Sequence, residues 1–503
     1  FMPVTLKFRL TDEEIACFAI QRPRFPGFDF QPRLVRHYPD GVLISHAVGY
    51  VGALSTDDLQ RLDPAAYAGT SHTGQTGVES SFESDLHGDA GYRHLIANAR
   101  GRQVPSDTSE LLDSLPFDET PMPGSNVYLS IDLDLQRIAT QALEGRRGAL
   151  VAIDPQNGEI LALVSAPAFD PNLFAVGMST AQYRELSENP DRPLFNRAVR
   201  GAYPPGSTIK PMLALAALEK NATNLTRKTV CHGYFQLPND DHRYRDWKPE
   251  GHGPVDLHDA IAQSCDVYFY EISGDIGIDT MHDYLTRFGL GSETGVDIGG
   301  ESSGLVPSRE WKRNNFSDRD NQRWYHGETV IVSIGQGYML ATPLQLASAA
   351  AALATRGKRY RPHMIAAVED ALTGERRMVQ PERLPDVEIS NDFYWENVLG
   401  AMHDVMQGPR GTARAVGFGA PYEMAGKSGT AQVVSIAQDE KYDDAELEER
   451  QRDHALFIAF APLDEPRIAV ALIVENGESG SGVAAPIAKA VMDAYLGYGD
   501  DAP

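Results

Sequence analysis

Apolar residues recur along the chain in short runs and in longer helical repeats, which predicts a fold of mixed strands and helices. Six short runs have the length and composition of strands, at residues 127–131, 148–154, 160–166, 430–434, 455–461 and 468–475. Three longer segments carry apolar residues at helical spacing, at residues 133–143, 211–218 and 485–496. Strands, a helical body, further strands and a closing helix predict an α/β (α+β) sandwich.

The first 125 residues have a different pattern, in which short alternating runs are separated by polar turns. Val4–Leu10 alternates apolar and polar side chains, as a half-buried strand does. Thr11 and Glu14 have the spacing of a capping box at the start of a predicted helix over 11–20. This region therefore predicts a small mixed domain.

Two polar segments that contain glycine predict connectors, at residues 70–77 and 120–125. The second one, Thr-Pro-Met-Pro-Gly-Ser, holds two prolines and a glycine, which interrupt any regular element. We therefore expect an N-terminal domain over residues 1–125 and a larger domain over residues 126–503.

Length and charge narrow the possible functions. A chain of 503 residues is too long for one compact core, and its net charge of −25 disfavours a nucleic-acid partner. It contains no apolar run of about eighteen residues, the minimum for a membrane-spanning helix. Because the chain begins at Phe1 rather than at a methionine, we expect it to be part of a longer protein.

Three short motifs carry residues suited to acyl transfer, Ser207-Thr-Ile-Lys210, Ser264-Cys-Asp266 and Lys427-Ser-Gly-Thr430. The first stands at the start of an apolar helix, where free backbone N–H groups and the helix dipole favour a developing negative charge. Lys210 follows Ser207 by one helical turn, so its amine can act as a general base for that serine. Each motif alone is common by chance, but the three in this order are hard to obtain by accident.

Similarity to a known family extends over most of the chain. Beyond the three motifs, the similar stretches are Gly88 with Gly91-Tyr92, Tyr128–Gln136, Ala166–Asn172, Tyr203–Pro211, Arg243–Trp247, Gly335-Gln-Gly337 and Thr342–Gln345. On these residues the chain resembles the class B penicillin-binding proteins, and within them the penicillin-binding protein 2 subgroup of Gram-negative bacteria. The resemblance implies a penicillin-binding/β-lactamase-like transpeptidase domain with a smaller N-terminal pedestal.

The resemblance also implies a reaction and the residues that perform it. Ser207 would attack the penultimate D-Ala carbonyl of a peptidoglycan stem peptide, and Lys210 would take its proton. Ser264 and Lys427 would relay that proton to the leaving amine. The acyl-enzyme would then be resolved by the amine of a second strand, which makes the chain a serine D,D-transpeptidase for cell elongation and a target of β-lactams.

Further roles follow for the residues around these motifs. The backbone N–H groups of Ser207 and Thr430 would form the oxyanion hole, and the hydroxyls of Ser428 and Thr430 would hold the substrate carboxylate. Gly429 would let a ligand backbone approach the edge of the strand. Asp266 stands where many relatives have Asn, and this favours the elongation subgroup over the septal one.

Four residues around the second motif predict a structural zinc site. Cys231, Asp246, His252 and Cys265 offer thiolate, carboxylate and imidazole ligands, and some members of the subgroup bind zinc at corresponding positions, usually with Asp in place of Cys231. Two alternatives are a disulfide between Cys231 and Cys265, or two buried thiols. Catalysis itself needs no cofactor, and Cys17 is expected only to pack in its helix.

Family membership implies a place in the cell and a set of partners. We expect the periplasmic face of the inner membrane, with an N-terminal membrane helix absent from this chain. The expected partners are stem peptides, β-lactams, a glycan-polymerising glycosyltransferase and scaffold proteins of the elongation complex. A D,D-carboxypeptidase or β-lactamase, which use water as acceptor, and a β-lactam sensor are the alternative functions on the same fold.

Overall fold

The protein is described here as a computed structural model that covers residues 6–7, 10–30, 32, 34–67, 70–92, 119–434 and 447–499. The chain divides into two compact units. The first comprises Phe1–Tyr128, Asp170–Glu185 and Ala366–Val379, and the second comprises Leu129–Phe169, Leu186–Ile365 and Gln380–Pro503. Segments 170–185 and 366–379, which the sequence analysis placed in the larger domain, thus belong to the first unit.

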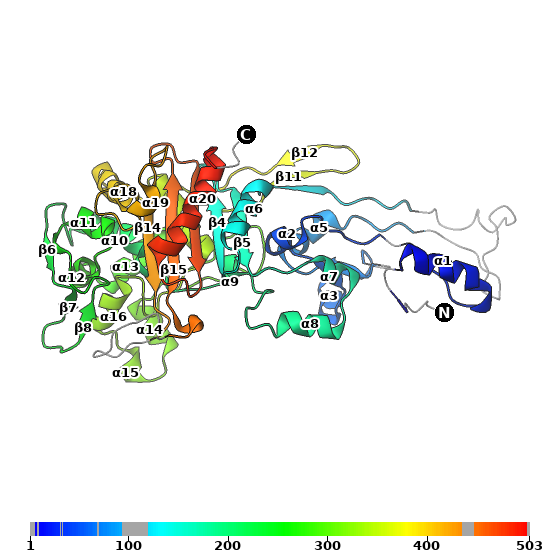
Figure 1. Ribbon diagram of the computed structural model, residues 1–503, viewed down its shortest axis with the longest axis horizontal. Helices are drawn as coiled ribbons and strands as arrows, with labels where there is room; N and C mark the ends of the chain where they lie inside the picture. Colours follow the sequence, from blue (N-terminus) through cyan, green and yellow to red (C-terminus); the bar gives the residue numbers. More distant parts are fainter. Residues whose placement is uncertain are drawn as a thin grey trace. The chain divides into compact units, whose positions relative to one another are not determined.

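A five-stranded antiparallel sheet forms the centre of the second unit (Figure 1). Its strands are, in order, β14 (Ala425–Ala431), β15 (His454–Ala461), β16 (Ile468–Val474), β4 (Gly148–Ile153) and β5 (Ile160–Ala166). Every residue of β4 and β16 is buried, as expected of strands covered on both faces. Because β14 is an edge strand, one side of its backbone has no strand partner in the described part of the chain.

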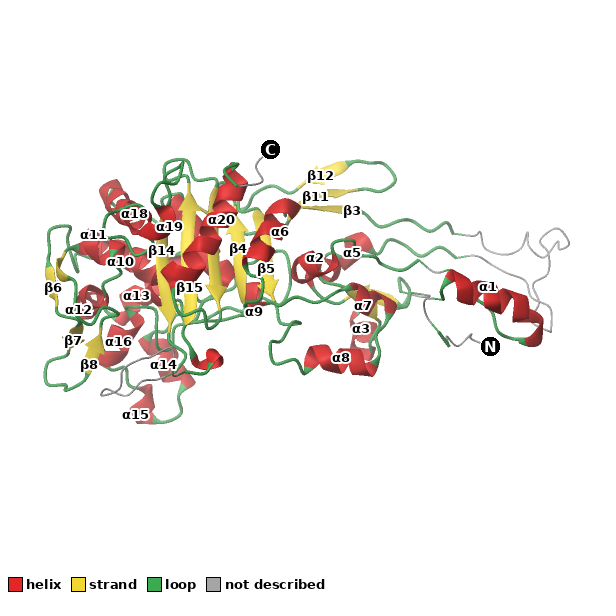
Figure 2. Cartoon of the chain, viewed as in Figure 1, coloured by secondary structure: helices red, strands yellow, loops and turns green. Residues whose placement is uncertain are grey.

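Helices cover the two faces of this sheet (Figure 2). Helices α6 (Leu133–Ala142) and α20 (Ala485–Leu496) pack against each other and lie in front of the strands in this view. Helix α17 (Pro343–Ala354) packs against the central strands β15, β16 and β4 from the other face. The predicted α/β sandwich is thereby confirmed.

A group of helices beside the sheet surrounds α10 (Lys210–Glu219). Every residue of α10 from Lys210 to Leu218 is buried, which explains its continuous apolar sequence. Its neighbours are α11 (Leu257–Ala262), α12 (Asp266–Ile276), α13 (Ile278–Arg287) and α18 (Asp392–Met406). Since α18 also packs against β14, this group stands at the edge strand of the sheet.

Hydrogen bonds explain why segment 170–185 joins the first unit. The backbone N–H of Tyr38 donates to Oδ1 of Asn172, and Nδ2 of Asn172 donates to the carbonyl of Tyr38. Within the same unit, Arg36 forms an ion pair with the buried Glu79. The two hydrogen bonds between Tyr38 and Asn172 link parts of the chain that lie 134 positions apart.

The first unit is built from short elements. They are α1 (Asp12–Gln21), α2 (Gly41–Val48), β1 (Val51–Ala53), α3 (Thr56–Arg61), β2 (His72–Gly74), α4 (Gly77–Ser81), α5 (Glu83–Leu86), β3 (Asn126–Leu129), α7 (Asn172–Val176), α8 (Thr180–Ser187), β11 (Ile365–Glu369) and β12 (Arg376–Met378). The predicted capping box of Thr11 and Glu14 is present at α1. The predicted connector over 70–77 was wrong in part, because β2 pairs with β1 there. Most of the strand predicted over Val4–Leu10 lies outside the described residues.

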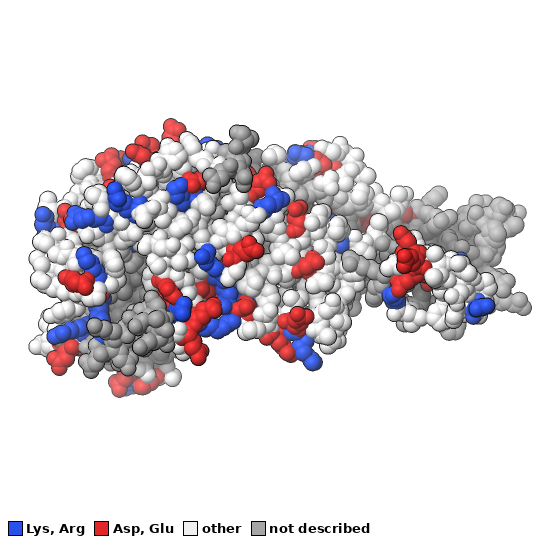
Figure 3. Space-filling model, in the orientation of Figure 1, with Lys and Arg blue, Asp and Glu red and all other residues white. Residues whose placement is uncertain are grey.

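The remaining elements of the second unit are also short. They are α9 (Arg197–Arg200), β6 (Thr229–Cys231), β7 (Tyr234–Gln236), β8 (Arg243–Arg245), β9 (Gly253–Val255), α14 (Arg309–Asn315), α15 (Arg319–Gln322), α16 (His326–Val332), β10 (Arg359–Tyr360), β13 (Arg383–Leu384) and α19 (Arg414–Gly417). In the face shown in Figure 3, basic and acidic side chains are interspersed. No helix among the described residues is long and apolar enough to cross a membrane.

Candidate active site

Ser207 lies in a 3₁₀ turn, Gly206–Ile209, that leads directly into α10. We predicted the first turn of the helix itself, and the structure places the serine just before it. Gly206 adopts a φ of +55°, and a Cβ on it would lie 2.6 Å from the carbonyl oxygen of Thr430. The turn therefore packs directly against β14, and only glycine fits there.

The Lys427-Ser-Gly-Thr motif lies inside β14, whereas the sequence analysis put it at the start of a strand. A Cβ on Gly429 would meet the side chain of Thr208 at 2.8 Å and the carbonyl of Pro205 at 2.9 Å. The glycine thus permits close contact between the strand and the serine turn. The hydroxyl of Ser428 lies 3.1 Å from the hydroxyl of Thr412.

Ser264 lies in the short connection between α11 and α12, and Asp266 is the first residue of α12. Ser264 has a φ of +57°, in the left-handed region that non-glycine residues rarely adopt, and such strain clusters at functional sites. Nζ of Lys210 donates to Oδ1 of Asp266 at 2.7 Å and to the carbonyl of Ser264 at 2.9 Å, and lies 3.5 Å from Oγ of Ser264. Nζ of Lys427 lies 2.8 Å from that same hydroxyl.

Burial and charge set the protonation of this cluster. Lys210 and Lys427 are both fully buried. Burial, reinforced by repulsion from Lys210, holds the pKa of Lys427 well below its ordinary value. Burial raises the pKa of Asp266, and the ion pair with Lys210 opposes this effect. Two amines thus approach a single hydroxyl: that of Lys210, which contacts Asp266, and that of Lys427, whose pKa is lowered.

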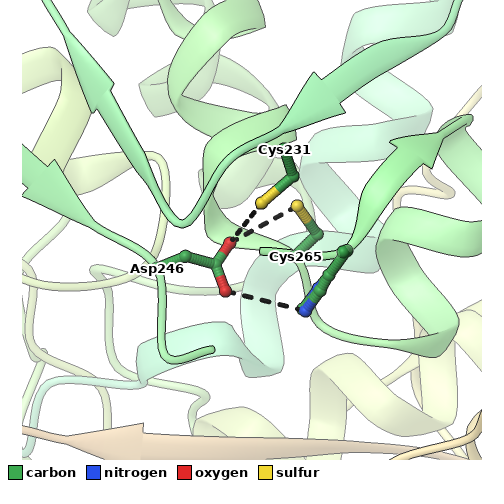
Figure 4. Close-up of side chains that lie close together, drawn as sticks. Cys231, Asp246 and Cys265 are labelled. Carbon is green, nitrogen blue, oxygen red and sulfur yellow. Dashed lines mark hydrogen bonds and ion pairs between the residues drawn. The ribbon is translucent and has the colours of Figure 1, made fainter. Parts of the chain in front are cut away.

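Cys231, Asp246, His252 and Cys265 converge as a second cluster, and their ligand atoms all lie within 4.8 Å of one another. Figure 4 shows both cysteine sulfurs directed at the Asp246 carboxylate, with Oδ2 at 3.5 Å from Cys231 and 3.4 Å from Cys265. Nε2 of His252 lies 3.6 Å from Oδ1 of the same carboxylate. The backbone N–H of Asp266 donates to Asp246 at 2.8 Å, so this cluster contacts the second motif directly.

The donor set fits a divalent cation. Among the described residues, neither ring nitrogen of the buried His252 has a hydrogen-bond partner, and such a loss is costly unless another group, such as a metal ion, binds the nitrogens. Both cysteines are free and buried, and burial raises the pKa of each thiol. Burial also lowers the pKa of His252, which keeps its imidazole neutral. A cation such as zinc would take the place of the thiol protons and bind the neutral imidazole.

Two family models match the chain. The model of the penicillin binding protein transpeptidase domain matches residues 148–493, and the model of the penicillin-binding protein dimerisation domain matches residues 1–129. The peptidoglycan D,D-transpeptidase MrdA of Acinetobacter baumannii is 46% identical over 497 residues, which cover 98% of this chain and 70% of that protein. The chain belongs to the class B penicillin-binding protein 2 family.

Solved structures of penicillin-binding protein 2 have the same fold. The Pseudomonas aeruginosa protein in complex with WCK 5153 superposes with a TM-score of 0.79 at 46% identity, covering 93% of this chain and 92% of that one. The Helicobacter pylori protein in complex with MreC superposes with a TM-score of 0.80 at 30% identity, covering 97% and 84% of the two chains. The family identified from the motifs is thus confirmed.

A partly buried network beside the Tyr203–Pro211 stretch had no role in the sequence analysis. Oε1 of Glu475 accepts from the Tyr203 hydroxyl at 2.7 Å and from Nε of Arg197 at 2.8 Å. The backbone of Tyr203 pairs with Ala341 in both directions. Tyr203 lies four residues before Ser207, so the network holds one end of the serine turn. The Tyr-Pro-Pro-Gly-Ser sequence indicated a turn, but nothing in the sequence near Tyr203 indicated that its hydroxyl would bind Glu475.

Proposed function

We propose that this peptidoglycan D,D-transpeptidase forms its acyl-enzyme on Ser207, by attack on the penultimate D-Ala carbonyl of a donor stem peptide. The main support is the convergence of all three motifs, in which Lys210 and Lys427 approach the Ser264 hydroxyl at 3.5 and 2.8 Å beside the serine turn. A buried cluster of two amines and a hydroxyl can accept, store and return one proton.

The proton follows the path of these contacts. Burial raises the pKa of Asp266, so this carboxyl can take a proton from Lys210 and leave its amine neutral. As the Ser207 oxygen bonds to the D-Ala carbonyl carbon, its proton passes to that neutral amine. On collapse of the tetrahedral species the amide C–N bond breaks, and the same proton passes from Lys210 through the Ser264 hydroxyl to the leaving amine. Lys427 holds that hydroxyl at 2.8 Å, and because burial lowers the pKa of its amine, Lys427 can exchange a proton with Ser264 during the transfer. Asp266 keeps Lys210 in place through its 2.7 Å contact.

The edge of β14 supplies the remaining groups. The N–H groups of Ser207 and Thr430 would stabilise the oxyanion, an effect worth about 3–4 kcal/mol per donor in hydrolases. The closeness of Gly206 to Thr430 supports this pairing, because it brings the serine turn against that residue. Ser428 and Thr430 would bind the substrate carboxylate with their hydroxyls, and Gly429 leaves room for the ligand backbone.

The acceptor decides between this function and its alternatives. An amine of a second stem peptide would release the acyl group as a crosslink, whereas water would make the protein a carboxypeptidase. Incubation with a donor ending in D-Ala-D-Ala and an acceptor amine, followed by mass analysis, distinguishes them. We expect the crosslinked peptide as the main product and slow loss of a penicilloyl adduct. Hydrolysed donor alone, or rapid turnover of penicillin, would contradict the proposal.

We also propose that Cys231, Asp246, His252 and Cys265 hold a structural zinc ion. Four protein ligands leave no open position, so the ion would stabilise the fold rather than take part in the reaction. Asp246 accepts from the backbone N–H groups of Asp266 and Val267, at 2.8 and 3.2 Å. A zinc ion bound to the Asp246 carboxylate would therefore also fix the start of α12 and the second motif.

Location and partners follow from the family as part of the same proposal. The substrate lies in the periplasm, so we propose that the chain acts at the periplasmic face of the inner membrane, with a membrane anchor outside this sequence. The H. pylori relative was solved in complex with MreC, which supports a scaffold protein as a partner of this chain. A glycosyltransferase that polymerises glycan strands is the second expected partner.

A further inference from the structure

Gln336 makes a contact that connects the serine turn to the edge strand. It lies in the loop after α16, between Gly335 and Gly337, which both have positive φ values near +73°. Its side-chain Nε2 donates to the carbonyl oxygen of Thr430 at 2.9 Å. The neighbouring carbonyl of Gly335 accepts from the backbone N–H of Gly206 at 2.9 Å.

These two contacts come from consecutive residues and reach both sides of the acylation site. A Cβ on Gly335 would lie 2.1 Å from the carbonyl oxygen of Gly206, so the loop is pressed against the turn that carries Ser207. In an antiparallel strand, the N–H and C=O of one residue point to the same side. The Thr430 carbonyl faces Gln336 and Gly206, and so its N–H is also directed away from β15.

We propose that Gln336 is a positioning residue for acylation, and this rests on the proposed oxyanion role of Thr430. By donating to the Thr430 carbonyl, Gln336 fixes the orientation of the backbone at that residue and hence the direction of its N–H. Through Gly335 the same loop fixes Gly206, so the distance between the Ser207 oxygen and the oxyanion donor is set by one short segment. Gln336 acts through Thr430 and does not itself react.

Three variants test this role. Gln336→Glu has the same size and shape, but its carboxylate can only accept, so near neutral pH it repels the Thr430 carbonyl. Gln336→Ala removes the contact without adding charge. Gln141→Glu, on the exposed surface of α6, makes the same chemical change on a helix that packs against the opposite edge of the sheet, at β5. The readouts are the acylation rate constant with penicillin and the melting temperature, between pH 4 and 8.

We expect Gln336→Glu and Gln336→Ala to slow acylation roughly tenfold to a hundredfold at pH 7.5, as misplaced catalytic groups do, while the melting temperature stays near that of the parent. Below pH 5 the glutamic acid becomes protonated and can donate again, because a carboxyl group titrates near about 4.3. The rate of Gln336→Glu relative to the parent should then recover several-fold, and that of Gln336→Ala should not.

Two results would overturn the inference, namely rates within twofold of the parent for both variants, or a loss in Gln336→Glu that is independent of pH. The second result would mean that Gln336 only fills space. Failure of the parent itself to acylate would instead contradict the proposed function. The control Gln141→Glu is expected to acylate at the parental rate. A similar loss of acylation in Gln141→Glu would mean that the added negative charge, and not the contact of Gln336, slows the reaction.

Discussion

Nζ of Lys427 lies 2.8 Å from Oγ of Ser264, and Lys427 is entirely buried. The two residues are separated by 163 positions in the chain, yet both Lys427 and Lys210 approach the hydroxyl of Ser264. Removal of this hydroxyl should therefore break the path of the proton while leaving both amines in place.

Substitution of Ser264 should lower the rate of acylation by penicillin about 10²–10⁴-fold, the usual range for loss of an acid–base group. Ser264→Gly is the better variant, since glycine accepts the φ of +57° that strains alanine. Ser303→Ala, at an exposed serine, is the control and should react like the parent. Acylation of Ser264→Gly at the parental rate would exclude the proposed relay.

The metal proposal predicts one zinc ion per chain in protein purified without chelator, measured by elemental analysis. Removal of the ion should lower the melting temperature, because two buried thiols and a buried imidazole then lose the ion that they bind. Cys231→Asp offers an oxygen ligand and should retain zinc, whereas Cys231→Ala should lose it. Zinc-free protein with an intact Cys231–Cys265 disulfide would support the alternative pairing.

Gly335→Ala tests the close approach of the loop to the serine turn. Its Cβ would lie 2.1 Å from the Gly206 carbonyl, at a φ of +73°. Gly145 has nearly the same φ, +72°, but a Cβ on it would have no atom of the described residues within 4 Å. Gly145→Ala should therefore cost only the backbone strain of about 1 kcal/mol, while Gly335→Ala loses more stability and most of its acylation. Equal effects of the two substitutions, by denaturant unfolding, would contradict this packing.

Glu475→Gln tests the network behind the serine turn. Hydrogen bonds from Arg197 and Tyr203 outweigh burial and lower the pKa of Glu475. As the pH falls, Glu475 thus binds a proton at a higher pH in the unfolded state than in the folded state. The stability that ionised Glu475 contributes is therefore complete above its pKa in the unfolded state and is lost as the pH falls through its pKa in the folded state. At pH 7 we expect Glu475→Gln to lose about 1–3 kcal/mol of unfolding free energy.

The same stability difference should shrink as the pH falls below about 4.3, where Glu475 begins to bind its own proton. Denaturant unfolding at several pH values measures it. Glu310→Gln, at an exposed glutamate, is the matched control and should differ little from the parent throughout. A loss for Glu475→Gln that stays constant down to pH 3 would show that charge does not matter at this position.

Local patterns in the sequence predicted the local features of the structure. The four apolar runs of β4, β5, β15 and β16 became strands because both of their faces are covered. The spacing of Ser207 and Lys210 likewise predicted that both lie where the apolar helix begins. Lys210 is the first residue of α10, and Ser207 lies in the 3₁₀ turn directly before it. Such features depend on neighbours in sequence, and so periodicity and motif spacing are sufficient to find them.

Features that depend on distant contacts could not be read from the sequence. Ala425–Gly429 looks unlike a strand because lysine and glycines disfavour it, but pairing with β15 overrides that preference. The contact between Gln336 and Thr430 spans 94 positions, and the Tyr203–Glu475 bond spans 272. The four proposed zinc ligands were named from their chemistry, but only the fold shows that their ligand atoms converge.

The central claim, that Ser207 is the nucleophile, is tested most directly by intact mass after incubation with penicillin, on the parent and on Ser207→Ala. We predict one stable adduct on the parent, located by peptide mapping to the segment that contains Ser207, and none on the variant. An adduct of equal yield on Ser207→Ala, or one mapped to another residue of the parent, would contradict the account.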